Sequence, residues 1–292
     1  MVDEAERAMT DALSVVSDVI ENSKIVAGGG AAEIEEAIVY HAAAEVGQGT
    51  HTVMRQMAAT ALGVPIEKVR LVVSDTATSG NSGSVSASRM TFMLGNSIRG
   101  AAELALKKWA DEERPAYVEY AWRAPKTTPY DPQTGKSEPN FAYGYVAEAC
   151  EVEVDVETGH VRVLRVWCAD DVGKAINPEL TKAQMEGGFV QGLSTALFES
   201  LQLKDGVVQN PSFVDYRIAT SADAPREVEA IIVEVPQDDG PWGARGIGEH
   251  ALVPTIPAIA NAIYDAVGFR PGEPPYLPEK VYLAMLEAGV VK

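Results

Sequence analysis

The chain alternates apolar and polar residues in two neighbouring stretches, Tyr145-Val-Ala-Glu-Ala-Cys-Glu-Val-Glu-Val-Asp-Val156 and Val161-Arg-Val-Leu-Arg-Val-Trp-Cys-Ala169. A period of two residues is typical of a β-strand with one buried face. The short connection between the stretches predicts a hairpin, with Gly159 at a positive-φ position of a three-residue loop. The apolar faces then meet in the register that places Cys150 opposite Cys168, and we interpret these residues as buried thiols.

Helical patterns and further short strands surround this hairpin. Helices are predicted for residues 3–22, from Thr50 to about Leu62, from about Ser88 to about Trp109, from Asn177-Pro178 to about Ser200, up to about Val267, and at the end of the chain. Strands are predicted for 38–40, 69–73, near Phe213 and for 229–235. This mixed order predicts an α+β fold of two-layer subdomains, in which helices pack on mixed sheets.

The expected domain organisation separates a short beginning from the rest of the chain. We expect residues 1–36 to form a helix and a glycine turn that do not make a domain, and residues 37–292 to form one domain. The proline-rich residues 114–140 look like an irregular surface connection, at which that domain can divide into subdomains.

The composition excludes several classes of function. The formal net charge is −18, whereas nucleic-acid binding requires clustered Lys and Arg. No apolar run approaches the roughly 20 residues that span a bilayer, and the acidic start does not resemble a signal peptide, so we expect a cytoplasmic protein without a membrane partner. Two cysteines cannot build an iron–sulfur cluster or an all-cysteine zinc site, and the four histidines are scattered without ligand-like spacing, so we expect any metal to be held mainly by something other than protein side chains.

The stretch Trp242-Gly-Ala-Arg-Gly-Ile-Gly-Glu-His250 places one carboxylate, Glu249, behind three glycines and before an apolar helix. Glycine is used where the backbone approaches another group closely or takes positive φ. A carboxylate in apolar surroundings is poised to exchange a proton. We therefore interpret Glu249 as a catalytic base at the floor of a pocket.

Three other places invite a functional interpretation, each beside a plain structural one. Gly47-Gln48-Gly49-Thr50 and Ser82–Ser88 both precede helices, whose N-termini bind anions such as phosphate; an ordinary capped turn and a solvated loop are the alternatives. Gln191 lies among three glycines in a predicted helix. Glycine is costly there, so something must approach closely, and helix packing explains this as readily as a cofactor.

Together these segments resemble the molybdenum hydroxylases, the xanthine dehydrogenase and aldehyde oxidase family. The resemblance extends from about Ile38 to Leu286 and depends on the order and spacing of six motifs. They are Ala44-Glu-Val-Gly-Gln-Gly-Thr-His-Thr52, Ser84-Val-Ser-Ala-Ser88, Val154-Asp-Val-Glu-Thr-Gly159, Asp171-Val-Gly-Lys-Ala-Ile-Asn-Pro178, Gly188-Phe-Val-Gln-Gly192 and Gly243-Ala-Arg-Gly-Ile-Gly-Glu249.

The resemblance implies a molybdenum–molybdopterin cofactor, in the cytosine dinucleotide form that three-subunit bacterial relatives usually carry. It implies hydroxylation of an aldehyde, a purine or another N-heterocycle with water, while electrons leave through iron–sulfur and flavin (FAD) partner chains. Glu249 would deprotonate a molybdenum-bound hydroxyl, and the pterin dithiolene would hold the metal. The residues that would contact the cofactor are Gly47, Gln48, Gly49 and Gln191 at the pterin, and Ser86, Ala87 and Ser88 at the pyrophosphate end.

Two features depart from this family. Nothing here corresponds to the earlier half of its molybdopterin region, so a partner chain would have to supply that half; the alternative is an inactive fragment or fusion with incomplete sites. The first ~34 residues resemble group II chaperonins, in which the residues matching Asp11 and Gly28–Gly30 serve an ATP site. The phosphate-binding loop of chaperonins is absent, so we expect no nucleotide binding. In addition, His250 replaces a proline of many relatives, which leaves the substrate class open.

Overall fold

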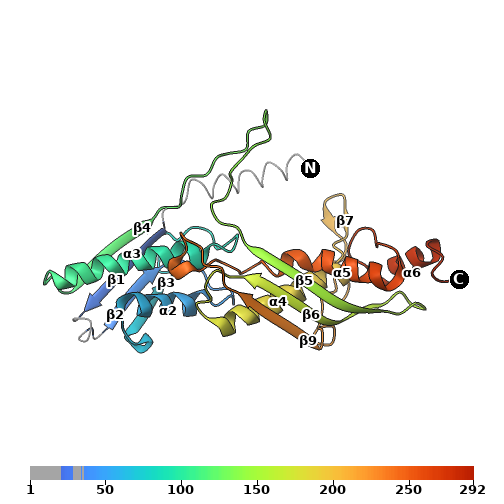
Figure 1. Ribbon diagram of the computed structural model, residues 1–292, viewed down its shortest axis with the longest axis horizontal. Helices are drawn as coiled ribbons and strands as arrows, with labels where there is room; N and C mark the ends of the chain where they lie inside the picture. Colours follow the sequence, from blue (N-terminus) through green and yellow to red (C-terminus); the bar gives the residue numbers. More distant parts are fainter. Residues whose placement is uncertain (1–20, 29–33, 35) are drawn as a thin grey trace. The chain divides into compact units, whose positions relative to one another are not determined.

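The computed structural model describes residues 21–28, 34 and 36–292 (Figure 1). They divide into two compact units. Unit 1 comprises the described residues up to Tyr143, together with Val172–Asn177 and Glu234–Gly246. Unit 2 comprises Gly144–Asp171, Pro178–Val233 and Ile247–Lys292. Each unit combines a small mixed sheet with packed helices, which confirms the predicted α+β fold class.

Unit 1 is a four-stranded sheet with the order β3-β2-β1-β4. The strands are β1 (Glu21–Gly28), β2 (Glu36–His41), β3 (Val69–Val73) and β4 (Ala116–Trp122). β1 runs antiparallel to β2 and β4, whereas β2 and β3 are parallel. The helices α2 (Thr50–Leu62) and α3 (Met90–Ala110) contact the sheet and each other, and two 3₁₀ turns, η1 (Ile66–Lys68) and η2 (Pro241–Gly243), complete the unit.

The core of unit 1 lies where α2 and α3 cover the sheet. Alternate residues of β2 point into this core, so that Ala37, Val39 and His41 are all buried. Met54 and Leu94 meet them from α2 and α3 and are fully buried. A histidine therefore occupies a core position, and it does so directly before the loop that leads to α2.

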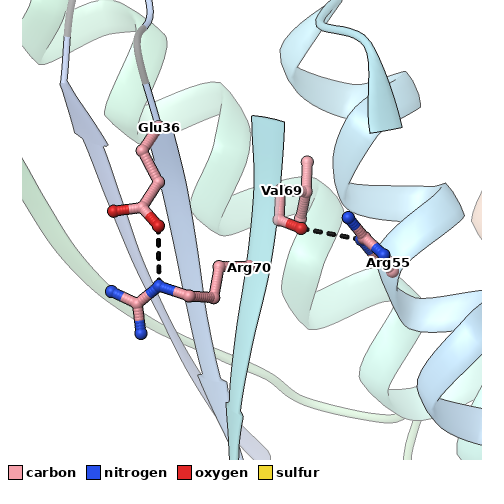
Figure 2. A network of polar contacts seen from close by, with 4 residues as sticks. All are labelled: Glu36, Arg55, Val69 and Arg70. Atoms are coloured by element: carbon pink, nitrogen blue, oxygen red, sulfur yellow. Dashed lines mark hydrogen bonds and ion pairs between the residues drawn. The ribbon is translucent and has the colours of Figure 1, made fainter. Parts of the chain in front are cut away.

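Polar contacts fix β3 on both sides (Figure 2). Arg55 of α2 donates from Nε to the carbonyl oxygen of Val69 at 2.7 Å. Arg70 donates to Oε1 of Glu36 on β2 at 2.6 Å. The Glu36–Arg70 pair lies at the surface, where ion pairs add little stability, so its main effect is to fix the pairing of β2 with β3.

Unit 2 contains a three-stranded sheet with the order β5-β6-β9. β5 (Tyr145–Val154) and β6 (Val161–Asp171) are antiparallel, and β9 (Glu227–Val233) is parallel to β6. The helices are α4 (Pro178–Leu197), α5 (Leu252–Val267) and α6 (Pro278–Glu287), and a separate hairpin joins β7 (Leu203–Lys204) to β8 (Val207–Val208). The buried core is formed chiefly by Val161, Val163, Val166, Phe189, Leu193, Ile259, Ile263, Val281 and Met285.

The register of the β5–β6 hairpin differs from the prediction. Cys150 pairs with Val166, and Cys168 pairs with Glu148. The partner of Glu151 is Arg165 and that of Val152 is Val163, so Leu164 is the extra residue of a β-bulge. A bulge shifts the alternation of buried and exposed residues by one position. Before Leu164 in the sequence the buried residues are Val161 and Val163, and after it they are Val166, Cys168 and Asp170.

The loop of this hairpin is also longer than the predicted three residues. Asp155 donates its backbone N–H to the carbonyl oxygen of His160 at 2.9 Å, which closes the loop around Gly159. The positive φ predicted for Gly159 is present, at 76°. Both cysteines are free thiols, as predicted, although Cys150 is only partly buried. Burial raises the pKa of the Cys150 thiol to about 12, with the Glu148 charge adding to the effect.

Several predicted elements need correction. The strand near Phe213 is wrong, because residues 213–215 form a turn, and the β7–β8 hairpin was not predicted. The segment 114–140 contains β4, so it is not irregular throughout. The helix predicted for 3–22 lies outside the described residues up to position 20, and residues 21 and 22 belong to β1. Among the described helices, none is long and apolar enough to cross a membrane.

Candidate functional site

The loop before α2 is closed by the carboxylate of Glu45. Oε1 of Glu45 accepts the backbone N–H groups of Gly47 and Gly49, and Oε2 accepts that of His51, each at 2.9 Å. Gly49, with φ at 83°, is the N-cap of α2, and Gly47 has φ at 105°. The loop geometry therefore requires both glycines. The carboxylate of Glu45, which belongs to the same chain, occupies the N-terminus of α2.

The Gln48 side chain also stabilises this loop from within. Its Oε1 accepts the N–H of Val46 at 2.7 Å, while Nε2 donates to the carbonyl oxygen of Ala44 and to Oγ1 of Thr50, each at 2.9 Å. A side-chain amide has two donors and one acceptor oxygen, and all three groups take part here. The predicted cofactor contact of Gln48 is therefore better suited to its backbone than to its side chain.

The loop before α3 contains two consecutive non-glycine residues with positive φ. These are Ala87 at 52° and Ser88 at 53°, followed by Arg89 in the right-handed helical region. Left-handed backbone is costly for residues with a side chain, and such outliers cluster at functional sites. A left-handed residue followed by a right-handed one also directs N–H groups toward a common point that suits an anion.

Arg89, the N-cap residue of α3, holds this loop. Its guanidinium donates to the carbonyl oxygens of Ser84 at 2.9 Å and Ser82 at 3.2 Å, and it lies directly over Gly83, where a β-carbon would come within 2.2 Å of Nη2. The α2 loop carries an internal carboxylate, whereas the α3 loop carries an internal cation. Of these two helix starts, only the second keeps a charge complementary to phosphate.

The glycine-rich stretch before Glu249 contacts the same α3 loop within unit 1. A β-carbon on Gly246 would lie 1.4 Å from the carbonyl oxygen of Ser88, so no other residue fits without moving that backbone. A β-carbon on Gly173 would likewise lie 2.2 Å from the carbonyl oxygen of Gly243. The structure therefore brings together three motifs that are far apart in the sequence, with Ser88 and Gly246 separated by 158 positions.

In unit 2 the glycines around Gln191 serve helix packing. A β-carbon on Gly192 would lie 2.4 Å from Cβ of Thr255, and one on Gly188 would lie 3.1 Å from Cβ of Ala251. Both neighbours belong to the beginning of α5. Of the two explanations that the sequence left open for these glycines, the structure supports packing of α4 on α5. Gln191 itself is exposed, and its cofactor contact stays a prediction.

Glu249 lies in the turn that leads into α5, and both of its neighbours are anchored. Gln184 of α4 donates to the carbonyl oxygen of Gly248 at 2.7 Å, and the His250 ring contacts Asp170. Glu249 is an exposed residue, so the apolar surroundings expected from the sequence are not provided by this chain alone. Its glycine neighbours serve backbone packing instead. The role of Glu249 as a base stays a prediction.

His250 is held inside unit 2 by a buried carboxylate. Nδ1 of His250 lies 3.1 Å from Oδ1 of Asp170, whose side chain is fully buried, and the ring covers Gly144, where a β-carbon would come within 2.1 Å. The sequence suggested that His250 could alter a substrate contact. The structure directs its ring toward the protein interior, where it fixes the position of the turn.

A second carboxylate, that of the partly buried Glu148, anchors the first turn of α5. Thr255 donates to Oε2 of Glu148 at 2.9 Å and to the carbonyl oxygen of Ala251 at 2.8 Å. Burial raises the pKa of Glu148 and the neighbouring charge of Asp170 raises it further, whereas hydrogen bonds from Thr255 and Cys168 oppose this. Oε1 of Glu148 and Oδ2 of Asp170 are buried, with no hydrogen-bond partner among the described residues. This polar cluster supports the start of α5.

The predicted site residues thus fall into two sets. Gly47, Gln48, Gly49, Ser86, Ala87 and Ser88 lie in unit 1, and Gln191 and Glu249 lie in unit 2. Sequence reasoning missed Glu45, Arg89, Asp170 and Glu148 as residues that shape these loops. An acidic residue shortly before a helix start is a recognisable signal, and it could have identified Glu45. The described residues contain no cluster of three or more His, Cys, Asp or Glu side chains that could hold a metal ion.

Comparison with known proteins identifies the family of this chain. The sequence matches the molybdopterin cofactor-binding domain over residues 35–121 and 104–225, which together span more than half of the chain. The aldehyde oxidoreductase of Megalodesulfovibrio gigas is 34% identical over 77% of this chain. A putative xanthine dehydrogenase molybdenum-binding subunit of Escherichia coli is 28% identical over 87% of it.

Solved structures agree with this assignment. The aldehyde oxidoreductase of Desulfovibrio gigas superposes with a TM-score of 0.81 and 31% identity over 92% of this chain. The chain spans only 31% of that structure, and 26% and 38% of the two relatives above. The family match covers the loops before α2 and α3 and the helix α4. The chain belongs to the molybdopterin cofactor-binding domain family of the molybdenum hydroxylases.

Proposed function

We propose that this chain is the molybdopterin-binding portion of a molybdenum hydroxylase, which hydroxylates an aldehyde, a purine or another N-heterocycle with water. Electrons would pass to iron–sulfur and flavin (FAD) partner chains. The observation that carries this proposal is the family match over residues 35–225. The names of the relatives, which include an aldehyde oxidoreductase and a subunit of a 6-hydroxypseudooxynicotine dehydrogenase complex, support a multi-subunit oxidoreductase.

The residues of unit 1 fit a cofactor with a phosphate end. The left-handed backbone of Ala87 and Ser88 before α3 is a geometry that suits an anion such as pyrophosphate. A β-carbon on Gly47 would meet no atom within 4 Å, so its backbone is open to approach. We propose that Gly47, Gln48, Gly49, Ser86, Ala87, Ser88 and Gln191 contact the molybdopterin, in its cytosine dinucleotide form. The cofactor supplies a redox metal held by its own dithiolene.

Glu249 would act as the general base of the reaction. Its carboxylate would accept the proton that is released when oxygen from water is transferred to the substrate. The turn that carries Glu249 is fixed by Gln184 on one side and by Asp170, through His250, on the other. A fixed backbone of this kind keeps a base in position for proton transfer. Glu249 is exposed in this chain, so the water-free environment for that step would have to come from substrate, cofactor or a partner chain.

A second possibility is that the chain is a catalytically inactive fragment. It is favoured by the short share of the relatives that this chain spans and by large apolar side chains at its surface, such as Phe213 and Val214, which are 77% and 79% exposed. An apolar surface of this kind suits a partner that covers it. In that case the chain alone would bind an environment-sensitive apolar dye and would contain no molybdenum.

The test is a comparison of two glutamine variants in the complex formed with the neighbouring subunits. Glu249→Gln should reduce turnover by roughly 10²–10⁴-fold, the usual contribution of a general base, while molybdenum content stays unchanged. Glu279→Gln on α6 is the matched control, because Glu279 is also an exposed glutamate of unit 2. Unchanged turnover in Glu249→Gln would refute the role of Glu249. A folded complex without turnover or molybdenum would favour the inactive fragment.

A further inference from the structure

The N-terminus of α2 already contains an anion, and that anion belongs to the chain. The carboxylate of Glu45 accepts three backbone N–H groups, from Gly47, Gly49 and His51, each at 2.9 Å. The first N–H groups of a helix have no partner within the helix and lie at the positive end of its dipole. A phosphate bound at a helix start uses the same kinds of contact. Glu45 thus makes the contacts that an external anion would make.

The electrostatics of Glu45 agree with a charged carboxylate. Partial burial raises the pKa of Glu45, but the hydrogen bonds from His51, Gly49 and Gly47 lower it more, so that the net pKa lies below its usual value. Its partners lie in the loop and in the first turn of α2. The Gln48 side chain links three other residues of the same segment, Ala44, Val46 and Thr50. Without the carboxylate, three N–H groups would lose their acceptor at once.

We propose that Glu45 is a positioning residue, which locks the Gly47–Gly49 loop in one conformation and excludes external phosphate from the start of α2. The loop would then meet its ligand through backbone groups that Glu45 leaves available, while the phosphate end of the ligand is directed to the start of α3. The consequence of this locked loop for molybdopterin binding rests on the proposed function. The capping of the α2 N-terminus by Glu45 does not depend on that function.

The test replaces Glu45 in the full chain and measures amide hydrogen exchange at Gly47, Gly49 and His51. In Glu45→Ala, exchange at all three amides should rise by about tenfold or more, because each loses a charge-assisted hydrogen bond. Formate, which carries the missing carboxylate, should restore most of the protection, whereas chloride at the same ionic strength should not. Glu67→Ala in η1 is the matched control, since Glu67 is an exposed glutamate of the same unit.

Wild-type exchange rates in Glu45→Ala, or a variant that formate does not rescue, would overturn the proposal. If Glu45→Ala does not fold, Glu45→Gln provides the same test, because its amide keeps an acceptor oxygen but loses the charge, and partial loss of protection is then expected. The effect of Glu45 on cofactor binding is measured separately. We expect the Glu45→Ala complex to contain less molybdopterin than the Glu67→Ala complex. Equal contents would overturn that role. A wild-type complex without any molybdopterin would instead refute the proposed function and leave the exchange result standing.

Discussion

At the scale of the residue, His41 is the side chain whose environment is least expected from the sequence. It is fully buried at the end of β2, and neither ring nitrogen has a hydrogen-bond partner among the described residues. Its ring makes an edge contact with that of His51, with 5.5 Å between centroids. Burial, together with the charge of His51, lowers the pKa of His41 to about 4. The protein therefore folds with this histidine neutral.

This shift predicts a loss of stability in mild acid. In the unfolded chain His41 takes up a proton near its ordinary pKa of 6.5, whereas the folded chain does so only near 4, so the unfolded state binds more protons between these values. The free energy of unfolding should therefore fall as the pH drops from 7 to 5, with about 2 kcal/mol attributable to His41.

Denaturant unfolding of the wild type and of His41→Leu at several pH values measures this contribution. The leucine variant removes the titrating group while keeping an apolar core side chain, so its stability should fall less between pH 7 and pH 5. The difference between the two curves isolates His41 from the other groups that titrate in this range. Parallel curves would show that His41 is not buried as a neutral side chain.

The sequence identified the loops of the site better than the environments of their residues. The positions of Gly47–Gly49, Ser86–Ser88 and Glu249 before helices could be predicted from local patterns. The anchoring of Gly248 and His250, on either side of Glu249, could not be predicted, because it comes from Gln184 and Asp170, which lie 64 and 80 positions away. Such contacts between distant positions leave no local periodicity in a single sequence.

At the scale of the element, the packing of α4 on α5 places the turn that carries Glu249. Gly188 and Gly192 face Ala251 and Thr255, so the backbone of α4 comes close to the first turns of α5. Gly187, next to Gly188, has no atom within 4 Å of the position that a β-carbon would take. Neighbouring glycines in one helix thus have different reasons to be glycine, and only a structure separates them.

Two alanine variants test this distinction. Gly192→Ala should destabilise the protein by about 1–3 kcal/mol, because the added carbon would overlap Cβ of the fully buried Thr255. Gly187→Ala is the matched control in the same helix. It should be neutral or stabilising by up to about 1 kcal/mol, because alanine favours a helix interior over glycine. Thermal unfolding of both variants is the measurement, and equal melting temperatures would contradict the assigned interface.

The strands show where pattern reasoning succeeds and where it fails. β3 was predicted with its observed limits, Val69–Val73, and β5 and β6 were predicted to within two residues at each end. The register of the β5–β6 hairpin was not predicted correctly, because the bulge at Leu164 shifts the alternation in the middle of β6. Val163 and Leu164 are consecutive apolar residues at which the alternation changes phase, so the sequence carries a signal of the inserted position that the hairpin prediction did not use.

At the scale of the whole molecule, the chain consists of two units, each with its own core. Unit 1 carries the loops proposed to hold the cofactor, and unit 2 carries Gln191 and the turn of Glu249. The family match begins in unit 1 and extends into unit 2. Large apolar side chains are exposed along residues 201–218 of unit 2.

The central claim is that this chain holds molybdopterin when its partner chains are present. The most direct test is to purify the chain with the products of its neighbouring genes and to measure molybdenum and pterin per chain. We predict close to one of each, released together on denaturation. An intact, folded complex that contains neither molybdenum nor pterin, after expression in a host that makes the cofactor, would contradict the account.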